Sequence, residues 1–214
     1  MHALAVELAA MAQNGLTYAT DRYDRARYER LRTAAAELFG MLGGGDTGEL
    51  RIALAAESGH ATPKVDVRGA LFDRAGQVLL VRERHDGGWT LPGGWADALD
   101  PPSAAVVREV AEEAGLAVRA VRLAAVQDGS LHNHHHLHGR HHGGALFHIY
   151  KMFFLVERID PDQQPVAGLD EETTDVGFFP LDRLPDLSTR RTTAEQLRLM
   201  WAHHTDPSLP VAFD

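Results

Sequence analysis

The densest group of side chains able to do chemistry lies between residues 91 and 116. Three carboxylates, Glu109, Glu112 and Glu113, are three and four residues apart, so on a helix they would project from one face. They follow a Leu-Pro-Gly-Gly segment at residues 91–94, whose glycines allow the backbone to approach a ligand closely. Carboxylate oxygens at this density suit Mg²⁺ or Mn²⁺, with phosphate oxygens completing the coordination shell. The spacing therefore favours a divalent-metal site that handles phosphorylated substrates.

A solvated acidic face is the alternative explanation for the same three residues. Each like-charged pair at this spacing costs only about 0.2 to 0.5 kcal/mol on an exposed helix. Two observations favour the metal site. The carboxylates come directly after the glycine segment, and no Lys or Arg lies three or four residues C-terminal to any of them.

The carboxylates need a helix with defined ends to bring them together. Pro101 and Pro102 are tolerated only in the first turn of a helix, Asp100 or Ser103 can cap it, and Gly115 can end it. The apolar stripe expected to face the core, on the side opposite the carboxylates, consists of Val107, Val110, Ala111 and Ala114.

This segment resembles the Nudix box, a pattern of Gly, Arg-Glu, Glu-Glu and Gly at fixed spacings. The matching residues are Gly94, Arg108, Glu109, Val110, Glu112, Glu113, Gly115 and Leu116. One position differs, because Asp100 stands where the family has Glu; the charge is kept on a shorter side chain. The resemblance implies a Nudix hydrolase that cuts a diphosphate bond in a small nucleotide-type substrate, with Mg²⁺ or Mn²⁺ as cofactor.

The resemblance also implies the metal ligands. Glu109, Glu112 and Glu113 would ligate or orient the divalent ions, and a backbone carbonyl of Gly93 or Gly94 would add a ligand. Bound metal would neutralise the diphosphate, lower the pKa of a bound water and stabilise the leaving oxygen.

Two further box roles follow from the resemblance. Arg108 would hold a box carboxylate through a bidentate pair. The general base would be either Glu109 or a glutamate on a later loop, for which Glu171 and Glu172 are the candidates. The alternative for these last two residues is a solvated acidic loop.

The resemblance extends over most of the chain, including residues 13–18, 23–29, 62–68 and 148–154. It looks like the Nudix subfamily that acts on nucleoside diphosphates linked to a group X, with CDP-choline pyrophosphatase as an example. The expected reaction is therefore cleavage of CDP-choline to CMP and phosphocholine. An ADP-ribose or nucleotide-sugar pyrophosphatase is the alternative, although ADP-ribose-specific members often carry a Pro after the box, and none lies between Pro102 and Pro161. A non-catalytic ligand sensor is disfavoured because the box carboxylates are all present.

Residues outside the box must recognise the rest of the substrate. Trp89 and Trp95 could stack on a base, with core packing as the alternative. Arg51 and Arg68 could contact phosphate. The N-terminal segment could close over the site from the same subunit or from its partner.

Seven histidines fall within residues 132–142. Their spacing lacks a defined zinc pattern, and the chain has no cysteine to assist. A polar loop between two strands is the favoured interpretation, with a transition-metal or phosphate-binding loop as the alternative.

The surrounding pattern predicts an α+β Nudix fold, a mixed sheet sandwiched by helices, with a small all-helical N-terminal extension. Strands are expected near residues 65–72, 78–81, 119–126, 146–156 and 174–179, and a closing helix near 193–203. The N-terminal segment, residues 1–60, precedes the Nudix domain, residues 63–214.

Three N-terminal helices are expected. The first has Leu4, Leu8 and Met11 on one face and stops at Asn14-Gly15; the second starts at residues 20–21; the third spans residues 47–57. The second helix carries a stripe that predicts burial within the segment or against a second copy in a homodimer: Tyr28, Leu31, Leu38 and Leu42.

Composition narrows the class of partner. The net charge of −9 disfavours long nucleic acids and anionic membranes as the main partner. The absence of cysteine excludes disulfides and catalytic thiols, and neither a secretory signal nor a membrane-spanning apolar run is apparent. The expected location is the cytoplasm.

Overall fold

The computed structural model describes residues 1–132, 146–167 and 171–214. The chain divides into two compact units. The N-terminal helical unit contains residues 1–64 and 146–149, and the α+β unit contains the other described residues. The expected α+β class is confirmed. Among the described residues, no helix is long and apolar enough to cross a membrane.

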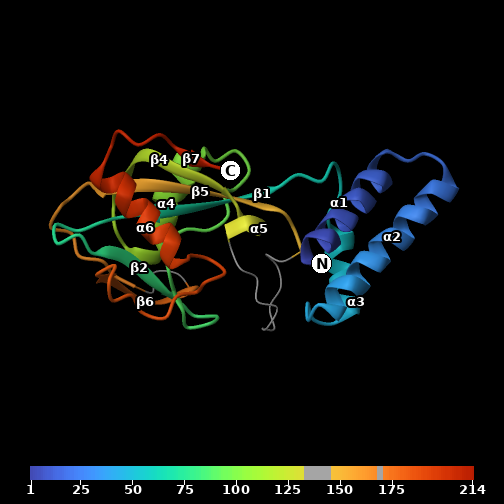
Figure 1. The fold of residues 1–214 in the computed structure, drawn as a ribbon, viewed down its shortest axis with the longest axis horizontal. Helices are drawn as coiled ribbons and strands as arrows, with labels where there is room; N and C mark the ends of the chain where they lie inside the picture. Colours follow the sequence, from blue (N-terminus) through green and yellow to red (C-terminus); the bar gives the residue numbers. More distant parts are fainter. Residues whose placement is uncertain (133–145, 168–170) are drawn as a thin grey trace. The chain divides into compact units, whose positions relative to one another are not determined.

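The N-terminal helical unit is built from α1 (His2–Tyr18), α2 (Arg22–Met41) and α3 (Thr47–Ala56), as Figure 1 shows. The side chain of Asp21 caps α2 and that of Asp46 caps α3, each accepting two backbone N–H groups. The predicted positions of the second and third helices are therefore confirmed.

The first helix differs from its prediction in length and in its buried face. It continues through residues 14–15, where a stop was expected. Leu4 and Met11 are exposed, and the buried residues are instead the small Ala5, Ala9 and Ala12. Small side chains let two helices approach closely. α2 also buries alanines, and the partly buried Leu8 packs against the same cluster, so one of the three predicted residues does contact the core.

Two sheets form the frame of the α+β unit. The first has the order β1 (Lys64–Ala70), β5 (Ile149–Arg158), β4 (Val118–Asp128) and β7 (Ala212–Phe213). The second has the order β3 (Trp89–Thr90), β2 (Val78–Glu83) and β6 (Thr173–Phe179). β4 runs antiparallel to β5 and parallel to β7, and β2 runs antiparallel to both of its neighbours. The short helix α5 (Gly129–His132) follows β4.

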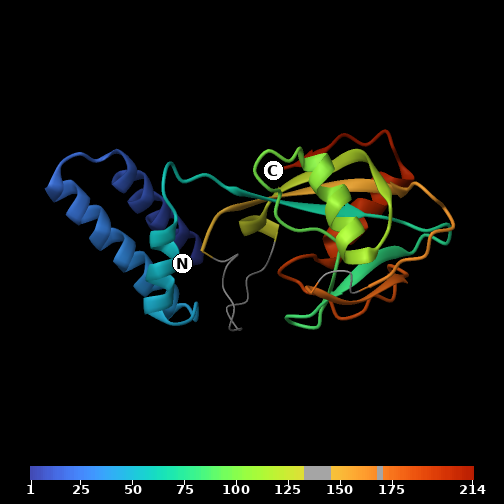
Figure 2. The same cartoon turned by 180° about the vertical axis from the view of Figure 1, so that it is seen from behind.

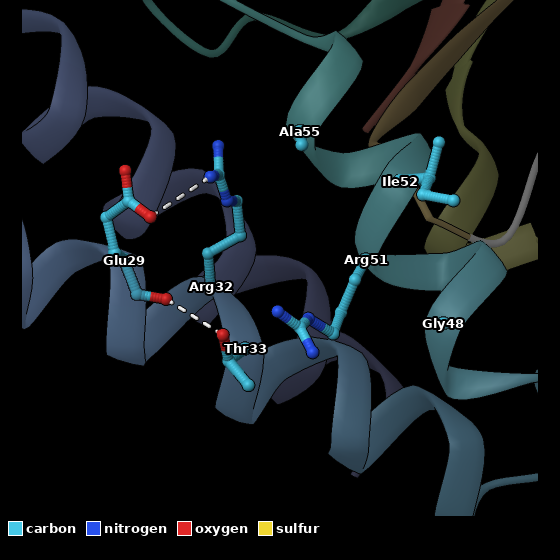
Figure 3. A pocket seen from close by; sticks show the side chains of 7 residues that line it. All are labelled: Glu29, Arg32, Thr33, Gly48, Arg51, Ile52 and Ala55. Carbon is cyan, nitrogen blue, oxygen red and sulfur yellow. Dashed lines mark hydrogen bonds and ion pairs between the residues drawn. The ribbon is translucent and has the colours of Figure 1, made fainter.

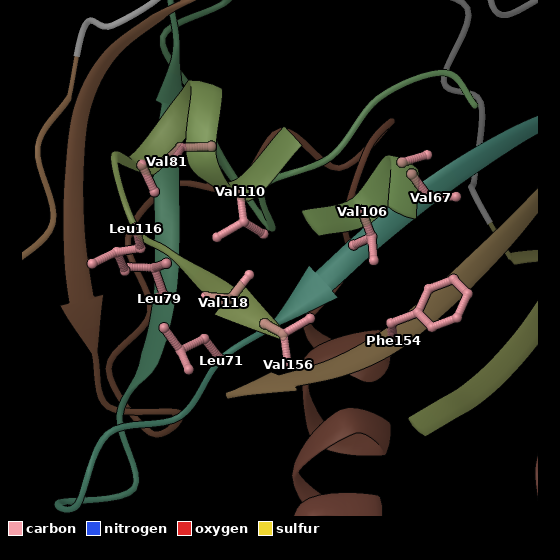
Figure 4. Packing of buried hydrophobic residues seen from close by; sticks show 12 residues of the cluster. Val67, Leu71, Leu79, Val81, Val106, Val110, Leu116, Val118, Phe154 and Val156 are labelled. Carbon is pink, nitrogen blue, oxygen red and sulfur yellow. The ribbon is translucent and has the colours of Figure 1, made fainter. Parts of the chain in front are cut away.

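Helices cover both faces of the first sheet. Figure 1 shows α6 (Ala194–Thr205) on one face, and Figure 2 shows α4 (Pro102–Ala114) on the other. Strand β5 contributes side chains to the apolar clusters on both faces of the sheet, because successive strand residues point to opposite faces. Phe154 packs in the cluster around α4 (Figure 4), whereas Phe153 packs in the cluster around α6.

Packing around α6 should contribute strongly to the stability of the α+β unit. Leu197 of α6 is fully buried, whereas Leu131 of α5 is 64% exposed. Leu197→Ala should lower the free energy of unfolding by about 2 to 5 kcal/mol because it leaves a cavity. The same change at Leu131 should cost less than about 0.5 kcal/mol. Urea unfolding followed by tryptophan fluorescence tests this, since all three tryptophans lie in the α+β unit; equal losses at both positions would contradict it.

Candidate active site

Helix α4 carries the box carboxylates, and its ends are set by backbone chemistry. Pro101 is the N-cap residue without a side-chain cap, so the predicted caps Asp100 and Ser103 are wrong. Asp100 lies 3.5 Å from the guanidinium of Arg108 instead. The predicted end is confirmed, because Gly115 adopts a left-handed conformation with φ of 66°.

The buried face of α4 is rotated from the predicted stripe. Val110 and Ala114 are buried as expected, but Ala111 is exposed. Ala105 and Val106 complete the buried face, and Figure 4 shows Val106 and Val110 above the strands. The rotation brings one of the three carboxylates out of solvent.

Glu113 is that carboxylate. Its side chain is 2% exposed and accepts a hydrogen bond of 2.8 Å from the backbone N–H of Gly93. Burial raises the pKa of Glu113 from its ordinary 4.5 to about 8, although Arg68 and the Gly93 N–H oppose the shift. Gly93 has a φ of 144°, and a Cβ there would lie 2.0 Å from the carbonyl oxygen of Val67. Only glycine fits the backbone that holds Glu113.

Glu109 lies against the next glycine. A Cβ on Gly94 would come within 2.9 Å of a Glu109 carboxylate oxygen, so this glycine leaves room for the carboxylate. Burial raises the pKa of Glu109, and Arg108 opposes the shift. The glycine segment and the helix carboxylates are thus in contact, as the sequence spacing suggested.

Arg108 makes several ion pairs rather than the single bidentate pair expected. Its Nη1 lies 2.9 Å from both Glu109 and Glu112. Its Nε and Nη2 lie 3.5 Å from Asp100 and 3.6 Å from Asp97. One half-buried guanidinium therefore links α4 to the loop that precedes it.

Glu171 and Glu172 lie at the start of β6, and both are exposed. Arg84 holds their backbone, because its Nε and N–H donate to the carbonyl oxygens of Glu171 and Glu172 at 2.6 and 2.8 Å. Glu172 also interacts electrostatically with Glu83, a buried carboxylate that the sequence analysis missed. The one available signal was a carboxylate ending the apolar strand β2.

The predicted substrate-binding residues have different environments. Arg68 is buried, with Nε and Nη2 donating to the two oxygens of Asp66 at 2.8 and 2.6 Å, and Nη1 to the Leu91 carbonyl. This geometry corrects the expected phosphate contact, since the guanidinium is committed to the interior. Trp89 packs edge-on against Phe179 in the α6 core, which matches the core-packing alternative.

Trp95, in contrast, is 46% exposed beside the glycine segment. Its backbone forms an isolated bridge with Asp66. A ring in this position remains available for stacking on a base.

Arg51 belongs to the N-terminal helical unit. It lines a cavity of about 380 Å³ between α2 and α3 (Figure 3), together with Glu29, Arg32, Thr33, Gly48, Ile52 and Ala55. Glu29 and Arg32 pair there at 3.7 Å. None of the lining residues belongs to the box.

Most of the histidine-rich stretch lies outside the described residues. His132 is described, and its Nε2 lies 2.6 Å from a carboxylate oxygen of Asp214. Among the residues that the structure describes, no three His, Asp or Glu side chains converge on a point where they could hold a metal ion. Glu112 in particular is turned toward Arg108.

Comparison with known proteins gives the family. A NUDIX domain matches residues 62–200, and a UDP-X-like N-terminal oligomerisation domain matches residues 1–51. YjhB of Bacillus subtilis (strain 168), a candidate ADP-ribose pyrophosphatase, is 39% identical over 98% of this chain and 95% of its own.

Solved structures agree. An ADP-ribose pyrophosphatase from Streptococcus suis 89-1591 is 38% identical with a TM-score of 0.59, covering 72% of this chain and all of its own. A UDP-X diphosphatase is 29% identical with a TM-score of 0.61, covering 99% of this chain and 97% of its own. The chain therefore belongs to the Nudix hydrolase family and is a pyrophosphohydrolase.

Proposed function

We propose that the protein hydrolyses the diphosphate of a nucleoside diphosphate linked to a group X, with Mg²⁺ or Mn²⁺ as cofactor. The observation that carries the proposal is the buried Glu113 carboxylate bonded to Gly93, with Glu109 against Gly94. This arrangement joins hard oxygen ligands to a backbone that a diphosphate can approach.

The residues fit a divalent ion. Burial of Glu113 disfavours the ionised form of its side chain. A cation beside it would offset the free-energy cost of that buried negative charge. Glu109 and Glu113 would hold the ion with a carbonyl of Gly93 or Gly94, and Glu112 would join after turning away from Arg108. When bound, the ion neutralises the diphosphate and activates water. Arg108 keeps the carboxylates oriented.

The general base remains a choice between two locations. Glu109 pairs with Arg108 at 2.9 Å, and its carboxylate lies 2.9 Å from where a Cβ on Gly94 would be. Glu171 and Glu172 are exposed at the start of β6 and are anchored through Arg84. We favour Glu109, because it lies on the same helix face as Glu113 and in contact with Gly94.

Two substrates of the class have support. The names of YjhB and of the Streptococcus suis enzyme favour ADP-ribose. The resemblance of the N-terminal segment and the box region to the X-linked subfamily favours CDP-choline. We place ADP-ribose first, because the relative named for it is 39% identical over nearly the whole chain, whereas the UDP-X diphosphatase that covers a similar length is 29% identical.

We also propose a homodimer formed through the N-terminal helical unit. The oligomerisation domain that matches residues 1–51 supports it. The apolar stripe of α2 is half-buried within its own unit, but α1 exposes Leu4 and Met11. These residues are seven positions apart and therefore share one helix face that a second copy would cover.

The metal proposal predicts the effect of Glu113→Gln. Loss of the ligand charge should lower kcat by at least about 100-fold with Mg²⁺, whereas Glu157→Gln, which alters an exposed carboxylate paired with Arg119, should leave kcat within about twofold. Steady-state assays measure both. Undiminished activity of Glu113→Gln, or of the wild type in excess EDTA, would refute the metal site.

The same variant has a stability readout. An acid whose folded pKa is raised destabilises the fold increasingly as pH rises from its unfolded to its folded pKa, here from 4.5 to about 8. In EDTA, the melting temperature of Glu113→Gln should therefore rise relative to wild type as pH increases over this range. A difference in melting temperature between the two proteins that does not change with pH over this range would contradict the assignment.

A substrate panel tests the reaction. ADP-ribose should give the highest kcat/KM and CDP-choline the next, both above UDP-glucose, NADH and nucleoside triphosphates, with products resolved by chromatography. A preference for triphosphates would contradict the X-linked class. Tight binding of one compound without turnover of any would support the sensor alternative instead.

The dimer proposal predicts a mass of about twice 23.4 kDa by light scattering at micromolar concentration. A variant with Leu4→Glu and Met11→Glu should be monomeric, because two charges would be buried at the interface. Leu131→Glu, at an exposed position of the α+β unit, should remain dimeric. A monomeric wild type, or a doubly substituted protein that stays dimeric, would exclude this interface.

A further inference from the structure

A buried carboxylate outside the box interacts electrostatically with Glu113. Glu83 ends β2, its side chain is 2% exposed, and it stands opposite Thr173 in the β2–β6 pairing. The hydroxyl of Thr173 donates to the carbonyl oxygen of Glu113 at 3.3 Å. Thr173 thus links the end of β2 to the end of α4, and the charge of Glu83 adds to the burial that raises the pKa of Glu113.

Arg191 is the cation that faces this carboxylate. Its Nη1 lies 3.1 Å from Oε1 of Glu83, and its side chain is 35% exposed. Burial raises the pKa of Glu83, and Arg191 is the strongest of the groups that oppose the shift. The pair thus joins an enclosed carboxylate to a guanidinium that solvent can reach.

A buried lysine fixes the backbone of Arg191. Nζ of Lys151, on β5, donates to the carbonyl oxygens of Arg190 and Arg191 at 2.9 and 2.5 Å. Burial lowers the pKa of Lys151 to about 7, with Asp66 opposing the shift. Burying the Lys151 ammonium costs free energy, and its two hydrogen bonds hold the successive carbonyl groups of Arg190 and Arg191 in one orientation.

The next residue ties the same segment to the glycine loop. The hydroxyl of Thr192 lies 2.8 Å from that of Thr90 and accepts the N–H of Leu91 at 3.2 Å. Leu91 directly precedes the Pro-Gly-Gly of residues 92–94. Arg191 therefore directly precedes a residue, Thr192, that contacts the loop holding Glu113.

Three other arginines near the site make hydrogen bonds or ion pairs with other groups. Arg68 is enclosed and bonded to Asp66, and Arg108 faces carboxylates of α4 and its loop. Arg84 donates to the carbonyl oxygen of Glu171. Arg191 is partly exposed, its backbone is held in place, and one of its nitrogens, Nη1, contacts Glu83. The other N–H groups of its planar guanidinium can therefore donate to an oxyanion.

We propose that Arg191 binds a phosphate oxygen of the substrate, and that Glu83 and Lys151 are positioning residues for its guanidinium. The inference rests on the proposed function, since it assumes a diphosphate at the box. A fixed guanidinium beside clustered carboxylates would offset their repulsion of an anionic substrate, in addition to any bound cation. Its role is substrate binding, so its removal should act mainly on KM.

The test compares Arg191→Gln, Arg191→Lys and the control Arg119→Gln, an exposed arginine paired with Glu157 across β4 and β5. Arg191→Gln should raise KM about 10- to 100-fold with a smaller change in kcat, and Arg191→Lys should restore part of the loss. Arg119→Gln should leave KM within about twofold. Calorimetry with inorganic pyrophosphate, with and without Mg²⁺, should show weaker binding by Arg191→Gln. This measurement needs no turnover, so it separates failure of this inference from failure of the proposed reaction.

The double variant Glu83→Gln with Arg191→Gln distinguishes binding from simple charge neutralisation. If Arg191 only neutralises Glu83, removing both charges should restore KM and pyrophosphate affinity to near wild type. We expect the double variant to regain thermal stability relative to Arg191→Gln alone while its KM stays high. Recovered pyrophosphate binding, or an Arg191→Gln variant that loses stability but keeps wild-type KM and affinity, would overturn the proposal.

Discussion

The hydrogen bond between the N–H of Gly93 and the carboxylate of Glu113 sets the geometry on which the rest of the site depends. It joins α4 to the glycine segment at a point where the backbone tolerates no side chain. It also places a carboxylate where water cannot solvate it, so the protein must supply opposing charge. Arg68 contributes at a distance, because its guanidinium is enclosed by Asp66 and a backbone carbonyl. The surrounding charges of Arg68, Glu83 and Glu109 all act on this buried acid.

Arginines near this acid have distinct tasks, which their solvent exposure separates. Arg68 is enclosed and braces the strand β1 against Leu91. Arg108 is half-buried, and its positive charge between Glu109 and Glu112 offsets the repulsion of these two carboxylates. Arg191 is partly exposed and faces Glu83. Residue type alone does not distinguish these positions, since an arginine serves structure, orientation or binding according to how many of its donors are already satisfied.

Features that depend on local chemistry, such as helix ends, were predicted correctly from the sequence. Features that depend on tertiary contacts, such as the buried face of a helix, were not. The start of α2 and the end of α4 follow from Asp21 and Gly115, whose effects are confined to one turn. The predicted face of α1 was wrong at Leu4 and Met11, because Leu and Ala stripes are both helical and close packing on α2 favours the alanines. Strands β3 and β7 have two residues each, too few to show a period. Glu83 and Arg191 were missed because they meet only in the fold, across more than a hundred residues.

The segment around residues 188–193 is held by several hydrogen bonds, and it keeps Arg191 in place beside the buried charge of Glu83. Ser188 accepts the N–H groups of Arg191 and Thr192, and its own side chain donates to Asp86. Thr193 then caps α6 in a capping box with Gln196. The segment is thus fixed by the α6 core on one side and by Lys151 on the other. Apolar clusters pack around both α4 and α6. Their burial stabilises the fold, so the site can keep desolvated charges that destabilise it locally. The segment thus connects the cluster around α6 to the glycine loop that holds Glu113.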